Sequence, residues 1–161
     1  MQTEKEMPPK RRMYASKYIW KGAYRMATVK TTYLGDLRTE SVHVESGTII
    51  QTDAPKDNQG KGEAFSPTDL VATALGCCIL SIAGMAARTH GFNIEGATIE
   101  TDKIMGTNPR RIVELVTTIT LPHNNYSAKE KKIIELTARE CPVYNSVHPD
   151  MKKTITFIYK D

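Results

Sequence analysis

The sequence predicts one α+β domain over residues 26–161, preceded by a basic extension over residues 1–25. Three observations lead to this fold class. The chain of 161 residues is 40% hydrophobic and 25% charged, which is the composition of an ordinary globular domain. Strand-like and helix-like patterns follow one another in the order three strands, helix, two strands, helix, strand. The first of these helices is apolar all round, which is typical of a helix buried inside a domain.

The first part of the domain is expected to form strands. Residues 27–34 are rich in Thr, Val and Tyr, and the Gly-Asp pair that follows them is a hairpin signal. Two further strands are expected over residues 37–45 and 47–52. Residues 53–64 have no apolar periodicity and are expected to form a loop. The length of this loop favours a role in covering a site, although a solvated connection is the simpler alternative.

A long helix is expected over residues 67–90. Ser66 can cap this helix, Pro67 suits the first helical position, and Gly91 can end it. Residues 70–87 are uncharged, so a membrane span has to be considered. Thr, Ser, Gly and five Ala residues dilute this stretch. We therefore expect a buried helix of a soluble domain, with strands packed on every side, and no insertion into a membrane.

The rest of the domain is expected to form two strands, a helix and a closing strand. The two strands cover residues 96–105 and 110–121, and a Gly-Thr-Asn-Pro turn joins them. The helix runs over about residues 128–140, after which Pro142 should end or redirect it. Residues 152–159 alternate in the manner of a strand.

The basic charge of the chain comes from its first residues. The net charge is +4, and residues 1–25 contain seven basic and two acidic residues, so the predicted domain is close to neutral. A nucleic-acid-binding protein carries its basic patch on the fold itself, so nucleic acid is not an expected partner. Residues 1–25 have no apolar run like that of a secretion signal, and three cysteines do not form a disulfide framework. A cytoplasmic setting is expected.

No motif indicates a metal or a nucleotide cofactor, and we expect neither. No CxxC or glycine-rich phosphate-binding pattern is present. The four histidines show no spacing typical of metal ligands: His43, His90, His123 and His148.

The cysteines carry the main chemical signal. Cys77 and Cys78 lie in the middle of the long helix, where a cysteine often packs as a small hydrophobic residue. Cys141 follows the second helix, directly before Pro142. One thiol on a rigid helix and a second at a helix junction suit a two-cysteine redox cycle. In such a cycle the first thiol becomes a sulfenic acid, and the second condenses with it to form a disulfide.

The cysteines belong to two longer motifs, FSPTDLVATALGCCILSIAGMAARTHGFNIEG and ARECPVYNSVHP. Together with LGDLR, TDAPKDNQGKGEAFSP and NPRRIVEL, these motifs resemble the OsmC/Ohr family of hydroperoxide-reducing proteins over roughly residues 27–160. The resemblance implies antiparallel sheets around a long buried central helix, in an intertwined homodimer with two active sites at its interface. It also implies a peroxidase that reduces organic hydroperoxides and is regenerated by a dithiol such as a lipoyl group.

The resemblance also assigns roles by position. Cys78 matches the peroxidatic cysteine, Cys141 the resolving cysteine, and Arg38 the guanidinium that holds the thiolate. Peroxidase members have a Glu ten residues before the peroxidatic cysteine, where this chain has Thr68. Asp69 is the neighbouring acidic candidate, but helical periodicity places it on the opposite face from Cys78, where capping the helix is the simpler role.

A cation beside the thiolate is needed because burial raises the pKa of a thiol, and a guanidinium stays charged. Four arginines compete for this role: Arg38, Arg88, Arg110 and Arg111. Arg38 is preferred because the family places this arginine upstream of the helix. Cys77 receives no role from the resemblance.

Three functions remain open at this point. The first is the two-cysteine peroxidase for organic hydroperoxides. The second is a dimer of the same fold that binds a lipid-like apolar ligand without catalysis, in which case the missing Glu marks lost activity. The third is a dimer with a purely structural role.

Overall fold

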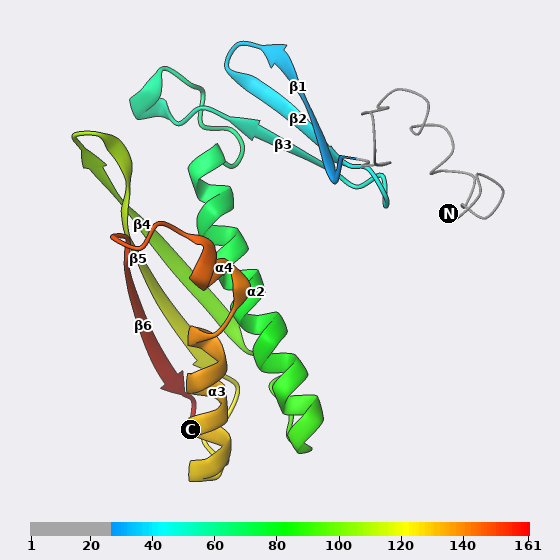
Figure 1. Ribbon diagram of the computed structural model, residues 1–161, viewed down its shortest axis with the longest axis vertical. Helices are drawn as coiled ribbons and strands as arrows, with labels where there is room; N and C mark the ends of the chain where they lie inside the picture. The colour runs from blue at the N-terminus through cyan, green and yellow to red at the C-terminus, as the bar shows by residue number, and fades with distance from the viewer. Residues whose placement is uncertain (1–26) are drawn as a thin grey trace, which may run out of the picture. The chain divides into compact units, whose positions relative to one another are not determined.

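The structure, a computed structural model, describes residues 27–161, and these fall into two units that divide between Ser66 and Pro67 (Figure 1). The predicted basic extension over residues 1–25 lies outside the described residues. The N-terminal unit is residues 27–66 and the C-terminal unit is residues 67–161, and each is described by itself.

A three-stranded antiparallel sheet forms the N-terminal unit, in the order β1-β2-β3. The strands are β1 (Val29–Gly35), β2 (Arg38–His43) and β3 (Ile49–Asp53), which confirms the three predicted strands with shifted ends. The turn between the first two strands lies at Asp36 and Leu37, whose φ angles are 50° and 61°. It therefore comes one residue later than predicted, and Leu37 adopts a left-handed conformation that is uncommon for its residue type.

The expected loop after β3 is present and folds back onto that strand. It contains one short 3-10 helix, η2 (Lys56–Asn58). At its end Phe65 forms a parallel bridge with Thr52. Gly60 is needed within this loop, because a Cβ atom there would lie 1.7 Å from the carbonyl oxygen of Ala54.

The C-terminal unit combines a second three-stranded sheet, in the order β4-β5-β6, with three helices. The strands are β4 (Thr98–Thr107), β5 (Arg110–Leu121) and β6 (Lys152–Tyr159), and the helices are α2 (Pro67–His90), α3 (Ala128–Arg139) and α4 (Pro142–Ser146). The predicted limits of α2, β5 and β6 are confirmed residue for residue. The helix α4 was not predicted as a helix, because a proline that ends one helix also suits the first position of the next.

One strand pairing differs from the prediction of antiparallel sheets. The strands β4 and β5 are antiparallel, but β5 and β6 pair in parallel over Glu114 to Leu121. The chain between β5 and β6 passes through α3 and α4, and such a crossover returns the chain to the end at which the previous strand began. The antiparallel prediction is therefore wrong for this pair.

The core of the C-terminal unit lies between α2, α3 and β5, and Figure 1 shows α2 and α3 side by side. Its largest buried apolar side chains come from all three elements: Leu75, Ile79, Leu115, Ile119 and Ile134. Full burial of each such side chain contributes about 1.5–3 kcal/mol to folding. Helix α2 lies very close to β4 at Gly76, where a Cβ atom would be only 3.0 Å from the Cγ2 atom of Ile99. Glycine, which has no side chain, permits this close approach.

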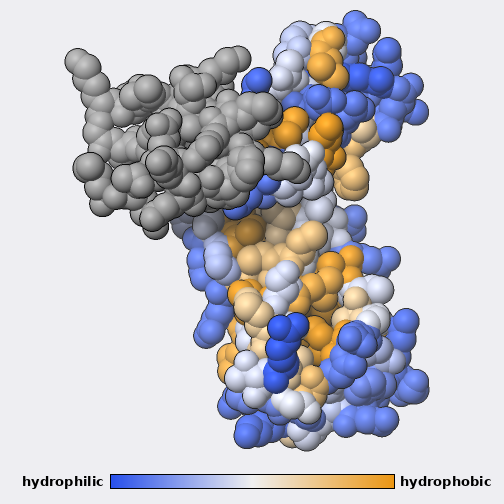
Figure 2. Space-filling model, turned by 90° about the vertical axis from the view of Figure 1, so that its right-hand side faces the viewer, coloured by the Kyte–Doolittle hydropathy of each residue, from blue (hydrophilic) through white to orange (hydrophobic). Residues whose placement is uncertain are grey.

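Helix α2 is packed on one face rather than on every side. Its buried positions share one face: Ala72, Leu75, Gly76, Ile79, Ala83 and Ala87. Other positions of the helix are exposed, among them Cys77 and Met85, which is 56% exposed. By length and composition α2 is able to cross a membrane, and 33% of its apolar stretch is buried. Figure 2, which views the side where α2 lies in Figure 1, shows apolar side chains gathered along this unit.

Candidate redox site

The structure brings Cys78 and Cys141 together within the C-terminal unit. Cys78 is half-buried on α2, and Cys141 is fully buried directly before α4. Their side chains are close enough to form a hydrogen bond with each other, and both are free thiols. Two residues that lie 63 positions apart in the sequence therefore form one thiol pair in the core.

Local sequence signals place Cys141 at this point. Helix α3 begins with a capping box, in which Ser127 Oγ accepts from the Glu130 N–H and the Glu130 side chain accepts from the Ser127 N–H. After α3 ends, Cys141 adopts extended backbone geometry, and its Sγ atom accepts the N–H of Tyr144 at 3.2 Å. The cysteine is thus the N-cap of α4, a position that usually holds a hydroxyl or carboxylate side chain.

The surroundings of Cys141 favour its protonated form. Burial raises the pKa of this thiol above its ordinary value, and the hydrogen bond to Cys78 acts in the same direction. The N–H of Tyr144 opposes both effects, but burial is the largest of the causes. Cys141 is therefore a neutral thiol at neutral pH, which suits a second, proton-carrying partner better than a first nucleophile.

Cys77 does not share this environment. It is exposed, whereas Cys78 packs against the core. One residue along a helix is a rotation of about 100°, which is enough to separate the two side chains onto different faces.

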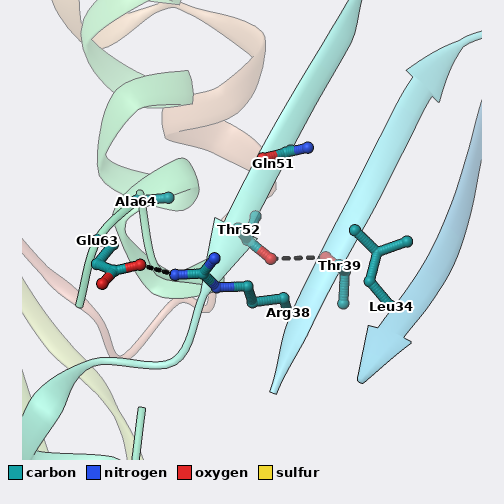
Figure 3. Close-up of a pocket in the computed structure, with 7 residues that line it drawn as sticks. All are labelled: Leu34, Arg38, Thr39, Gln51, Thr52, Glu63 and Ala64. Carbon is teal, nitrogen blue, oxygen red and sulfur yellow. Dashed lines mark hydrogen bonds and ion pairs between the residues drawn. The ribbon is translucent and has the colours of Figure 1, made fainter. Parts of the chain in front are cut away.

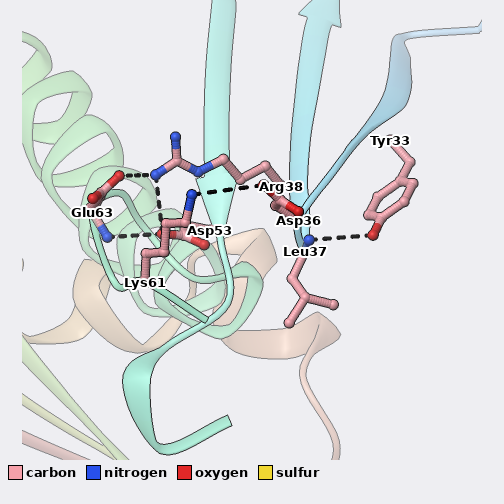
Figure 4. A network of polar contacts seen from close by, with 7 residues as sticks. All are labelled: Tyr33, Asp36, Leu37, Arg38, Asp53, Lys61 and Glu63. Carbon is pink, nitrogen blue, oxygen red and sulfur yellow. Dashed lines mark hydrogen bonds and ion pairs between the residues drawn. The ribbon is translucent and has the colours of Figure 1, made fainter. Parts of the chain in front are cut away.

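The N-terminal unit holds Arg38 in a polar cluster (Figure 4). Arg38 is the first residue of β2, and its guanidinium donates to the Glu63 carboxylate through Nη2. The same nitrogen lies 3.6 Å from Oδ2 of Asp53, which is fully buried at the end of β3. Sequence reasoning found Arg38 but missed both of its carboxylate partners, because one ends a strand and the other lies in a loop without periodicity.

A cavity of about 150 Å³ opens beside this cluster (Figure 3). Polar side chains make up most of its lining: Leu34, Arg38, Thr39, Gln51, Thr52, Glu63 and Ala64. Thr39 and Thr52 face each other across β2 and β3, with their hydroxyl oxygens 2.6 Å apart. The cavity therefore offers a guanidinium donor and hydroxyl groups to a small polar ligand.

Asp69 and Thr68 lie at the start of α2, where both contact Lys103 of β4. The ammonium group of Lys103 is 2.7 Å from Oδ1 of Asp69 and donates to Oγ1 of Thr68 at 2.7 Å. An acidic residue in the first turn also stabilises the helix dipole. This geometry ties the beginning of the helix to the sheet.

The three other arginines that competed for the thiolate-holding role belong to the C-terminal unit. Arg88 lies in the last turn of α2, ten residues and about 15 Å along the helix from Cys78. At the start of β5, Arg111 Nη1 lies 3.3 Å from Nδ1 of His148, which is exposed. Arg110 precedes Arg111 on the same strand. Within the described residues 27–161, no group of three or more His, Cys, Asp or Glu side chains is placed to hold a metal ion.

Comparison with known proteins identifies the family. The family model described as OsmC-like protein matches residues 60–156. A solved structure from Psychrobacter arcticus 273-4, named as a proposed osmotic stress induced and detoxification response protein, is 48% identical. The match covers 83% of this chain and 96% of that one, with a TM-score of 0.79. No curated protein matches the chain.

Two more distant structures share the fold. An OsmC-like protein from Mycoplasma pneumoniae is 18% identical with a TM-score of 0.71, and the match covers 85% of this chain and 99% of that one. An organic hydroperoxide resistance protein OsmC from Legionella pneumophila is 15% identical with a TM-score of 0.63, covering 83% and 98%. The α+β architecture and the family match agree, and the chain belongs to the OsmC-like protein family.

Proposed function

We propose that this protein is a thiol-dependent peroxidase that reduces organic hydroperoxides through Cys78 and Cys141. The observation that carries the proposal is the contact between these two thiols in the core of the C-terminal unit. Membership of the OsmC-like family supports it, as does the name of the Legionella pneumophila structure, an organic hydroperoxide resistance protein.

Cys78 is the proposed peroxidatic residue because its thiol is the more accessible of the pair. Its thiolate attacks one peroxide oxygen, the O–O bond breaks, and the other oxygen leaves as an alkoxide that takes up a proton to give the alcohol. The two electrons come from the sulfur, which becomes a sulfenic acid.

Cys141 is the proposed resolving residue. Its sulfur attacks the sulfenic sulfur of Cys78, the S–O bond breaks, and hydroxide leaves as water with the proton of the Cys141 thiol. A dithiol then reduces the disulfide by two exchange steps and is itself oxidised to a disulfide. A lipoyl group is the proposed source of this dithiol.

Arg38 is the proposed cation of the reaction. A guanidinium stays protonated at every relevant pH and can donate to both sulfur and a peroxide oxygen. Asp69 is proposed to act indirectly, by holding the start of α2 on β4 through Lys103. Cys78 packs against the apolar core, as do Val71 and Ile82 of the same helix, and an apolar setting favours organic hydroperoxides over hydrogen peroxide, because an organic group gains buried apolar area.

A cytoplasmic homodimer is the proposed state of the protein. The exposed positions of α2 include Cys77 and Met85 on a helix of high hydropathy, and a second copy would remove them from water. Light scattering coupled to gel filtration should give twice the mass of 18.0 kDa, and a monomer at micromolar concentration would contradict this.

Turnover of cumene hydroperoxide with dihydrolipoamide tests the peroxidase. We expect the wild type to be active and Cys78→Ser to lose at least about 10³-fold in rate, since the covalent step is removed. Cys141→Ser should keep one round of sulfenic acid formation and lose turnover with the dithiol. Cys77→Ser is the matched control and should keep full activity. Activity that survives Cys78→Ser would contradict the assignment, and co-purified lipid on an inactive wild type would support the apolar-ligand alternative.

A further inference from the structure

A buried carboxylate lies directly behind the guanidinium of Arg38. The Asp53 side chain is 0% exposed, and Arg38 is its opposite neighbour in the pairing of β2 with β3. Burial of an ionised carboxylate is unfavourable unless a cation and hydrogen bonds compensate for the lost hydration. The compensation here comes from Nη2 of Arg38 at 3.6 Å and from the N–H of Glu63, which donates to Oδ2 at 2.9 Å.

Asp53 is held from both its backbone and its side chain. Its N–H donates to the carbonyl of Phe65 at 3.0 Å, and its carboxylate binds the segment at Glu63 (Figure 4). A short, fully buried side chain with two fixed partners has little rotamer freedom. The carboxylate is therefore a stationary charge on the sheet.

Glu63, the other acidic partner of Arg38, differs in its exposure to water. Its side chain is 62% exposed, so water competes for its carboxylate and an ion pair there contributes little.

Two further atoms of the cluster could form a hydrogen bond with each other. Oδ1 of Asp53 and Nε of Arg38 are both buried, and neither has a hydrogen-bond partner among the described residues. One is an acceptor and the other a donor, as a two-pronged arginine–carboxylate pair requires.

We infer that Asp53 is the positioning residue of Arg38, and that Glu63 is an exchangeable partner of the same guanidinium. The Asp53 carboxylate fixes the orientation of the guanidinium through an ion pair of 3.6 Å now, and through two parallel hydrogen bonds when Glu63 gives way to an anionic or peroxide ligand. Asp53 touches no reacting atom in this scheme. Its effect on Cys78 rests on the proposed function, whereas its effect on Arg38 does not.

Side-chain NMR of Arg38 tests the positioning without reference to activity. In the wild type the Nε–H of Arg38 should have an order parameter typical of a rigid group, and in Asp53→Asn it should fall below about 0.6, the range of a flexible group. Asn keeps an acceptor for the Glu63 N–H, so the loop contact can survive. Glu63→Gln should leave this order parameter close to the wild-type value, and so should Asp36→Asn, the same chemical change at a side chain that is 82% exposed. An Arg38 side chain that stays rigid in Asp53→Asn would overturn the inference.

The rate of Cys78 oxidation by cumene hydroperoxide is the second readout. A misplaced catalytic group costs about 10²-fold, so Asp53→Asn should lower the second-order rate constant by about 10- to 100-fold, whereas the exposed control Asp36→Asn should change it by less than about threefold. In an Arg38→Met background, Asp53→Asn should have no further effect. An equal loss in both backgrounds would show a merely structural role and overturn the inference.

Two results would change the test: an Asp53→Asn variant that does not fold, and a wild type without peroxidase activity. If Asp53→Asn does not fold, Arg38→Lys replaces it, because Lys keeps the charge but cannot form two parallel bonds to one carboxylate. Arg38→Lys should lose at least about tenfold in rate, and a full rate would overturn the inference. If the wild type has no peroxidase activity, the proposed function fails, and the NMR result alone decides on Asp53.

Discussion

Arg38 in the N-terminal unit and Cys141 in the C-terminal unit are held in place by different forces. Arg38 is the first residue of the central strand of a small sheet, and its position depends on two carboxylates, one of them buried. Cys141 lies in an apolar core, packed with residues of α2, α3 and β5, and its Sγ atom accepts the N–H of Tyr144. A charged group is directional and needs a counter-charge, whereas a thiol needs only a space of the right size. The two groups should therefore respond to different kinds of substitution.

The largest expected effect is the loss of a side chain from the core that contains Cys141. Leu75 is 0% exposed in the core cluster that contains Cys141, so Leu75→Ala should lower the free energy of unfolding by about 2.7–5 kcal/mol. Urea denaturation followed by circular dichroism measures this change. The control is Leu37→Ala on the N-terminal sheet, where the side chain is 45% exposed and the loss should be below about 1 kcal/mol. Equal losses would remove the distinction between the two regions.

The second-largest loss of stability is expected from a charge substitution in the N-terminal unit. Arg38→Ala leaves the buried Asp53 without its cation, and we expect a loss of about 1–3 kcal/mol, which is less than for a fully buried pair because Arg38 itself is 35% exposed. Hydrogen exchange of the β2 and β3 amides measures it locally. Glu63→Ala should cost below about 1 kcal/mol, since its partner keeps Asp53. A larger effect of Glu63→Ala would reverse the ranking of the two carboxylates.

A smaller effect is expected at the start of α3, the helix that leads to Cys141. Ser127 caps this helix and closes its capping box with Glu130. Ser127→Ala should lower the free energy of unfolding by about 1 kcal/mol, and Ser127→Asp should restore most of it. Thermal unfolding of the three proteins measures the series. No difference between Ala and Asp would show that packing alone holds α3.

The same contrast explains which parts of the fold were predictable from sequence. The limits of α2 were predicted because Pro67 and Gly91 mark its two ends by local backbone chemistry. The parallel pairing of β6 was missed, since residues 152–159 show a strand pattern that is the same for either direction. Strand direction depends on the path of the connection and on packing between distant segments.

The residues of the candidate site also divide into those that the sequence predicted and those that it did not. Cys78, Cys141 and Arg38 were selected from sequence because thiols and guanidinium groups carry recognisable chemistry. Asp53 and Glu63 were missed because a carboxylate becomes a partner only through the register of β2 with β3 and the fold of the loop. The single-sided packing of α2 was also missed, because an apolar helix has the same composition whether its second face meets strands or is exposed in a single chain.

The smallest expected effect is a pH dependence that belongs to the thiol region alone. The pKa of Cys141 is raised in the folded protein, chiefly by burial, so folding favours the protonated thiol. Its contribution to stability is complete below the pKa of the unfolded thiol, near 8.5, and is lost as pH rises from there through the folded pKa. The free energy of unfolding should therefore fall as pH rises above about 8.5, and less so in Cys141→Ala. Burial raises the pKa of Tyr159 to about 12, so folding also favours its protonated form, but this adds to the slope only where an unfolded tyrosine begins to ionise, near pH 10. Arg38→Ala should leave the slope unchanged, because a guanidinium does not titrate there. A slope that persists in Cys141→Ala would show that another group, and not the buried thiol, carries the pH dependence.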